Sequence, residues 1–362
     1  MTAIADAVRV CLLHKLPLAL RGRPGVGKTS LVESTARTLG LSCEVVVGSL
    51  REPTDLAGLP VISADGSVIL APPAWALRAK AITSGAVVLL DELTTASPSV
   101  QSAMLRIVRE GVVGEERLPD HVRVVAAYND ADDCGGYELE LPMRSRLLHI
   151  EVTADVDTFI TGVTEGWPDQ VVDCTTMDSS THPPSRDKWC RLVAAFVKTR
   201  PSMLECPPAI GTWGGYPTPR TWEMLIDAAA AADAEGVSDE TRSILIGGCI
   251  GTGAALEFMT FVDQVDLPDP VMLLANPELA AVVFEQSRPD RVMVVLMEVA
   301  YTVQSSSDPT QWTNIWKIGA QAVSAGFGDL VAWTFRSVAR YRPMNATVPE
   351  EFATVRKFLE IA

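Results

Sequence analysis

Short apolar runs alternate with helical patterns over the first 152 residues of the chain. The runs are nearly continuous in valine, leucine, isoleucine and alanine, as expected for strands buried on both faces of a parallel sheet. Segments between them place apolar residues at helical spacing, as at Val100, Met104 and Ile107. This alternation predicts an α/β fold with a parallel sheet. The five predicted strands are residues 18–21, 43–47, 86–90, 122–127 and 147–152.

Helices and hairpins fill the intervals between these strands. Asp65-Gly66 separates two short apolar segments, 61–63 and 67–70, and this pattern is typical of a β-hairpin. Residues 111–118 predict a second hairpin. The predicted helices of this part are residues 3–14, 30–39, 74–82 and 99–109.

The pattern changes after residue 153. Residues 154–218 are rich in proline, serine, threonine and aspartate, with one predicted helix at 187–198, and are interpreted as a linker or insert. From residue 219 to 362 the pattern is helical throughout, and Gly251-Thr252-Gly253 is interpreted as a packing point inside one of these helices. The helices predicted here are residues 221–232, 239–261, 276–285, 290–303, 312–325, 328–340 and 348–362.

Composition excludes some classes of function. The 362 residues carry 45 acidic and 30 basic side chains, for a formal net charge of −15, which disfavours nonspecific binding to nucleic acid or to anionic membranes. The seven cysteines are scattered without a C-x-x-C pair, which favours a reducing cytosol and gives no cysteine-based metal site. No apolar run reaches the roughly 18 residues that a membrane span needs, and no signal-peptide pattern is found. We therefore expect a cytoplasmic protein.

A glycine-rich segment follows the first predicted strand. Residues 22–29 match G-x-x-x-x-G-K-[ST] without departure and lead into the helix at 30–39. Such a loop wraps phosphates with backbone N–H groups, and the helix N-terminus favours their negative charge. Lys28 is expected to reach the β- and γ-phosphates, and Thr29 to ligate Mg²⁺. The predicted residues for binding ATP are Gly22, Arg23, Pro24, Gly25, Val26, Gly27, Lys28, Thr29 and Ser30.

Two carboxylates end the apolar run at 86–90. Asp91 is the candidate Mg²⁺ ligand, and Glu92 is the candidate general base that polarises the attacking water. A carboxylate directly after the metal-binding aspartate favours hydrolysis over storage of the nucleotide. The alternative interpretation is a buried strand with a polar end.

Three further polar positions follow in order. Asn129 ends the next strand and is a candidate to orient the water and the γ-phosphate, with an ordinary turn as the alternative. Arg144 and Arg146 precede the last strand, where oligomeric ATPases place an arginine that reaches a neighbour's γ-phosphate. We favour Arg146 for that role with Arg144 in support, and solvated arginines are the alternative. Arg220 starts a helix after a rigid turn, from which it is expected to contact the γ-phosphate.

The ordered set from the glycine-rich loop to Arg220 resembles the AAA+ ATPases, and more narrowly their MoxR-type branch. Residues 49–58 resemble that branch's T-x-x-D-L-x-G segment. The hairpin at 61–70 resembles the insert into helix 2 that defines the wider clade. Residues 71–77 resemble its G-P-x-W-x-A-L signature, with Ala71 in place of the glycine.

This resemblance implies a five-stranded parallel sheet at residues 1–153, and an α-helical lid with a helical extension at 219–362. It also implies a hexameric ring with ATP and Mg²⁺ at subunit interfaces. Proteins of this branch act as chaperone-like factors that remodel or mature a protein client, often with a partner that carries a von Willebrand factor A domain. The alternative is an ATP-gated assembly scaffold whose hydrolysis only resets the ring. A DNA-directed motor is disfavoured by the acidic charge.

Overall fold

The computed structural model divides into two compact units. It describes residues 2–62, 64–130, 133, 135–165, 183–208, 212–264, 268–284, 288–340 and 342–361. The first unit contains residues 1–186 and 204–256, and the second contains 187–203 and 257–362. This division does not follow the predicted boundaries after residues 153 and 218, because the chain enters the second unit, returns, and enters it again.

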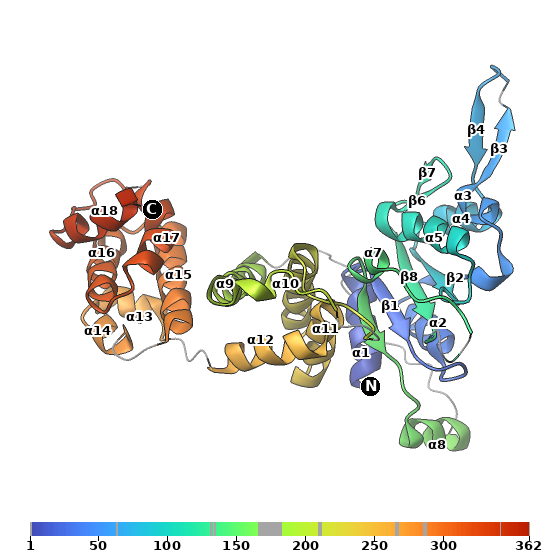
Figure 1. Ribbon diagram of the computed structural model, residues 1–362, viewed down its shortest axis with the longest axis horizontal. Coiled ribbons are helices and arrows are strands. Elements are labelled where there is room, and N and C mark those ends of the chain that lie inside the picture. The colour runs from blue at the N-terminus through green and yellow to red at the C-terminus, as the bar shows by residue number, and fades with distance from the viewer. Residues whose placement is uncertain are drawn as a thin grey trace. The chain divides into compact units, whose positions relative to one another are not determined.

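A five-stranded sheet forms the centre of the first unit (Figure 1). The strand order is β2-β5-β8-β1-β9, and every neighbouring pair is parallel. This confirms the predicted α/β fold with a parallel sheet. The register aligns the carboxyl ends of the strands, with Arg21 beside both Tyr128 and Glu151, and Val47 beside Asp91. The strands are β1 (Leu18–Arg21), β2 (Ser42–Val47), β5 (Ala86–Asp91), β8 (Val122–Tyr128) and β9 (Leu148–Glu151).

Helices cover both faces of the sheet because side chains of buried strands point alternately to the two sides. Val88 and Leu90 pack with Trp75 of α4 and Met104 of α5 in one cluster. Helix α1 contacts β1, and α2 contacts β2 and β5. The helices concerned are α1 (Ala3–Leu13), α2 (Lys28–Thr38), α4 (Ala74–Ala81) and α5 (Pro98–Glu110).

Both predicted hairpins are present. Strands β3 (Leu59–Ile62) and β4 (Val68–Ala71) pair antiparallel and project from the first unit (Figure 1). The second hairpin is short, and pairs β6 (Val112–Val113) with β7 (Glu116–Arg117). Three short elements that the pattern did not predict are η1 (Gly48–Leu50), α3 (Thr54–Ala57) and α7 (Leu141–Arg144). A further unpredicted helix, α8 (Val156–Glu165), follows β9.

Two helices after residue 218 belong to the first unit. Helix α10 (Pro219–Ala234) begins with a capping box between Thr218 and Thr221, and packs along α11 (Asp239–Ile250). Helix α11 also packs on β9, where a Cβ at Gly248 would lie 2.6 Å from the His149 carbonyl oxygen. The predicted single helix at 239–261 is wrong, because Gly251 adopts a φ of +80° and separates α11 from α12 (Thr252–Gln264).

The second unit is helical. Its core gathers large apolar side chains, including Trp312, Trp316 and Phe335, which are buried. Among the described residues, no helix is both long and apolar enough to cross a membrane. The elements are most of α9 (Pro183–Thr199), η2 (Pro201–Met203), the later part of α12, α13 (Pro270–Ala275), α14 (Leu279–Phe284), α15 (Pro289–Ser306), α16 (Pro309–Ser324), α17 (Gly328–Ala339) and α18 (Glu351–Ile361).

Candidate active site

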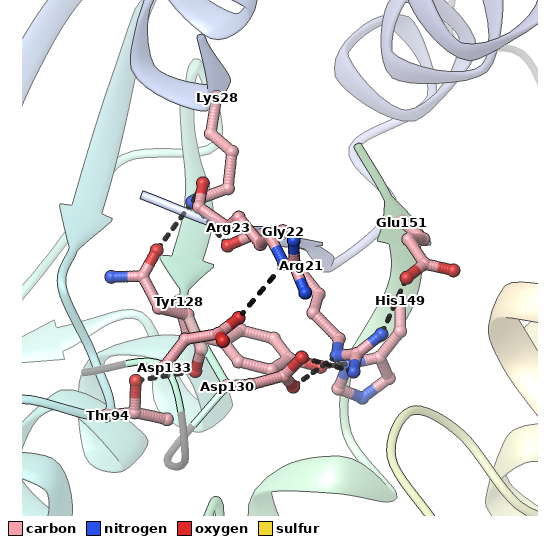
Figure 2. Close-up of polar contacts among 11 residues, drawn as sticks. Arg21, Gly22, Arg23, Lys28, Thr94, Tyr128, Asp130, Asp133, His149 and Glu151 are labelled. Carbon is pink, nitrogen blue, oxygen red and sulfur yellow. Dashed lines mark hydrogen bonds and ion pairs between the residues drawn. The ribbon is translucent and has the colours of Figure 1, made fainter. Parts of the chain in front are cut away.

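The glycine-rich loop connects β1 to α2 and holds its lysine inward. Lys28 is only 7% exposed, although an isolated lysine is rarely buried. Its Nζ donates to the carbonyl oxygens of Gly22 at 2.8 Å and Arg23 at 3.1 Å, and to Oδ1 of Asn129 at 2.7 Å. The loop therefore positions the ammonium group against the end of β8 (Figure 2).

The glycines of this loop serve two different purposes. Gly25 and Gly27 have φ angles of +82° and +92°, a region that side chains with a Cβ rarely adopt. At Gly22 the constraint is space, because a Cβ would lie 2.3 Å from the carbonyl oxygen of Val152. The first glycine thus allows the segment after β9 to lie directly against the loop.

Two side-chain oxygens meet at the start of α2. The Thr29 hydroxyl donates to Oδ2 of Asp91 at 2.6 Å, and the other carboxylate oxygen accepts from the Glu92 backbone N–H at 2.8 Å. Mg²⁺ prefers oxygen ligands in a small octahedral shell and keeps several waters or phosphate oxygens. The Thr29–Asp91 pair fits such an ion, since it supplies hard oxygen donors and leaves the remaining positions to phosphate and water.

Glu92 is held in an uncommon backbone conformation. Its φ is +56°, in the left-handed region that costs a non-glycine residue free energy. Its carboxylate accepts a hydrogen bond from the hydroxyl of Ser49, which lies in η1 after β2. Ser49 belonged to a recognised sequence segment, but only the pairing of β2 with β5 reveals that it contacts Glu92.

Asn129 directly follows β8 and has two anchors. Its side-chain Oδ1 accepts from Lys28, and its carbonyl oxygen accepts from the Thr94 hydroxyl at 2.8 Å. The contacts therefore bring Lys28 and Asn129 together, and place Thr29 beside Asp91.

A charged network that sequence reasoning missed lies beside the loop. Arg21 binds both carboxylate oxygens of Asp130, at 2.6 and 2.5 Å, and binds Glu151 at 2.7 Å (Figure 2). Its guanidinium lies 3.9 Å from the ring centroid of Trp213. The network lines a cavity of about 710 Å³ that also includes Gly22 and Asn129. The cavity therefore opens beside the phosphate loop.

The two arginines before β9 have different environments. Arg144 is buried, and its Nε donates to the Gly214 carbonyl oxygen at 2.8 Å. Arg146 is half-buried and its Nη1 donates to the Pro142 carbonyl oxygen at 2.5 Å. Partial burial, with the positive charges of Arg220 and Arg109 nearby, lowers the pKa of Arg146. The structure thus groups Arg146 with Arg220, which is exposed in the first turn of α10.

Comparisons with known proteins agree with this geometry. Residues 17–147 match the family model described as the AAA domain of the dynein-related subfamily. The loop and the polar ends of β5 and β8 lie within this matched segment, which is similar to an AAA domain.

Three curated proteins are similar to parts of this chain. Protein MoxR of Methylorubrum extorquens is 34% identical over 134 residues, which cover 36% of this chain and 38% of that protein. The uncharacterized protein YeaC of Bacillus subtilis is 27% identical over 187 residues, 50% of this chain and 52% of YeaC. Midasin of Giardia intestinalis is 30% identical over 190 residues, 48% of this chain and 4% of midasin. The chain is thus similar to MoxR over part of its length, and its matches span about half or less of each of these relatives.

Proposed function

We propose that this protein hydrolyses ATP with Mg²⁺ at the loop formed by residues 22–29. The observation that carries the proposal is the connected set of side chains at the strand ends: Lys28 bonded to Asn129, and Thr29 bonded to Asp91, with Glu92 following Asp91. In this proposal Lys28 binds the β- and γ-phosphates, and Thr29 and Asp91 hold the metal ion. The ion held by these two residues would supply Lewis-acid stabilisation of the negative charge that develops during phosphoryl transfer.

Glu92 is the proposed general base. In the structure the Ser49 hydroxyl donates a hydrogen bond to this carboxylate. When that hydrogen bond opens, the carboxylate can accept a proton from a water that Asn129 orients. Replacement of Glu92 by glutamine keeps the shape and removes the base. We expect Glu92→Gln to bind a fluorescent ATP analogue normally and to lose at least about a hundredfold in phosphate release. Unchanged phosphate release would refute this role.

We further propose that Arg146 completes the site of a neighbouring subunit in a ring of copies, with six as the expected number. Its partial exposure and its position near Arg220 support a role toward an anion outside its own subunit. Lys28→Ala and Arg146→Ala subunits should each be inactive alone. Mixing them should restore part of the turnover, because each supplies the group that the other lacks.

The proposed biological role is remodelling or maturation of a protein client, with a partner that carries a von Willebrand factor A domain. Similarity to MoxR supports this role. An ATP-gated scaffold is the competing proposal, and Glu92 favours turnover. If Glu92→Gln abolishes phosphate release while client activation persists in the presence of ATP, the scaffold proposal replaces the remodelling one.

A further inference from the structure

A buried histidine connects the phosphate-sensing end of β8 to the arginine-bearing turn before β9. His149 lies in β9 and is 3% exposed. One ring nitrogen, Nδ1, lies 2.8 Å from the Tyr128 hydroxyl, and the other, Nε2, lies 3.0 Å from the carbonyl oxygen of Arg144. Tyr128 directly precedes Asn129, and Arg144 lies two residues before Arg146.

The sheet topology makes this contact possible. Strand β1 lies between β8 and β9, and in its register Ala19 is beside His149 while Arg21 is beside Tyr128. Because alanine has a small side chain, the tyrosine and histidine rings meet across β1, with centroids 5.8 Å apart and planes at 85°. The hydrogen-bonded bridge from Tyr128 through His149 to the Arg144 carbonyl oxygen thus crosses the strand that leads into the phosphate loop (Figure 2).

The partners determine the protonation state of His149. Burial lowers the pKa of the ring to about 4, so the ring is neutral at physiological pH. A carbonyl oxygen only accepts, and therefore Nε2 carries the proton and donates it to Arg144. Nδ1 then accepts from the Tyr128 hydroxyl. Both ring nitrogens are satisfied, which fixes the ring in one orientation.

The two ends of the bridge differ in how firmly they are otherwise held. Asn129 has its own bonds to Lys28 and Thr94, at the end of a central strand. The turn at residues 144–147 follows α7, which is a single turn of helix, and its Arg144 side chain bonds to the Gly214 carbonyl oxygen. Loss of His149 is therefore expected to displace the arginine end more than the asparagine end.

We propose that His149 is a positioning residue that fixes the turn bearing Arg146 relative to the nucleotide-sensing strand, so that this arginine is aligned with the neighbouring subunit's nucleotide. The inference rests on the proposed role of Arg146 between subunits. A misplacement of about 1 Å at a reacting group can reduce rate by as much as a hundredfold, and a single lost hydrogen bond should have a smaller effect.

The test uses mixed rings of full-length chains, in which Lys28→Ala subunits supply the arginine and Arg146→Ala subunits supply the nucleotide site. A His149 variant is placed either in the Lys28→Ala subunit or in the Arg146→Ala subunit, which gives two arrangements. His149→Asn shortens the side chain so that it no longer reaches the Arg144 carbonyl oxygen, whereas His149→Gln retains an N–H near the position of Nε2. Phosphate release is measured in both arrangements, with mixing verified by native mass spectrometry.

We expect His149→Asn to reduce restored turnover about tenfold in the arginine-supplying subunit and less than about twofold in the nucleotide-binding subunit. His149→Gln should recover most of the loss. Equal losses in the two arrangements would overturn this inference and leave the proposed role of Arg146 intact. A glutamine variant as impaired as the asparagine variant would do the same. If the parent mixture shows no recovery, the proposed role of Arg146 fails, and this inference fails with it.

A second variant covers the case in which His149→Asn does not fold. Tyr128→Phe removes one hydroxyl from the same bridge and leaves the aromatic ring to pack. It should show the same asymmetry between the two arrangements with a smaller loss, and a symmetric loss would overturn the inference. Thr241→Val, which removes a buried hydroxyl in α11 away from the bridge, is the control and should leave both arrangements unchanged.

Discussion

The neutral state of His149 predicts a specific pH dependence of stability. The pKa of the ring is about 4 in the folded protein, against an ordinary value of 6.5, and the main cause is burial. Between these values the unfolded chain binds a proton that the folded chain does not. The contribution of the neutral ring to folding is therefore complete above about pH 6.5, and it is lost progressively as the pH falls toward 4.

The size of the effect follows from the shift. At about 1.4 kcal/mol per pKa unit, the whole shift corresponds to about 3 kcal/mol, and about 2 kcal/mol of it falls between pH 7.5 and pH 5. The His149→Gln variant has no titrating group at this position and lacks this component. The difference in opening free energy between wild type and variant should therefore shrink by about 2 kcal/mol over that interval.

Hydrogen exchange measured by mass spectrometry is the suitable assay, because peptides from β8 and β9 report on the first unit alone. Comparing the two proteins at the same pH cancels the intrinsic exchange rate, and other titrating groups are common to both. A difference that stays constant from pH 7.5 to pH 5 would mean that His149 titrates near its ordinary value. The protonation state assigned to the bridge would then be wrong.

Three further predictions concern other parts of the molecule. Gly22→Ala should weaken binding of a fluorescent ATP analogue by more than about tenfold, because its Cβ meets the Val152 carbonyl oxygen at 2.3 Å. Gly319→Ala should destabilise the second unit by about 1–3 kcal/mol in urea unfolding and leave nucleotide binding unchanged, because its Cβ meets an aromatic ring of α17 at 2.6 Å. Arg220→Ala mixed with Lys28→Ala should regain phosphate release if Arg220 acts on a neighbour's nucleotide, and should stay inactive if it acts within its own subunit.

The sheet and the position of the glycine-rich loop between a strand and a helix could be predicted because both depend on local pattern. Continuous apolar runs end at Asp91 and Asn129, and parallel strands bring such ends to one edge. A loop with a glycine-rich pattern between a strand and a helix has few alternative structures. The strands and the glycine-rich loop between β1 and β9 could therefore be predicted from the local sequence.

The side-chain networks could not be predicted because they depend on register. Arg21 meets Asp130 and Glu151 only because β8, β1 and β9 are adjacent and aligned at their ends. The contact of His149 with Tyr128 also requires a small residue on the strand between them. A sequence pattern contains no such pairing.

The boundary between α11 and α12 also could not be predicted from the sequence pattern. Apolar spacing continues from α11 into α12, and periodicity alone therefore predicted one helix. The break depends on a close approach, since a Cβ at Gly251 would lie 2.7 Å from the Gly215 carbonyl oxygen. The interpretation of this glycine as a packing point was compatible with a continuous helix, but its φ of +80° is not.

Repulsion among the arginines bears on the proposed role of Arg146 toward a neighbouring subunit. Arg146 lies near Arg220 and Arg109, and these charges, together with partial burial, disfavour its protonated form. Arg109 has the carboxylate of Glu110 beside it, whereas Arg146 hydrogen-bonds only a carbonyl oxygen among its described contacts. A bound triphosphate carries several negative charges, and its approach would relieve this repulsion. This grouping is what the proposed role of Arg146 toward a neighbour's nucleotide requires.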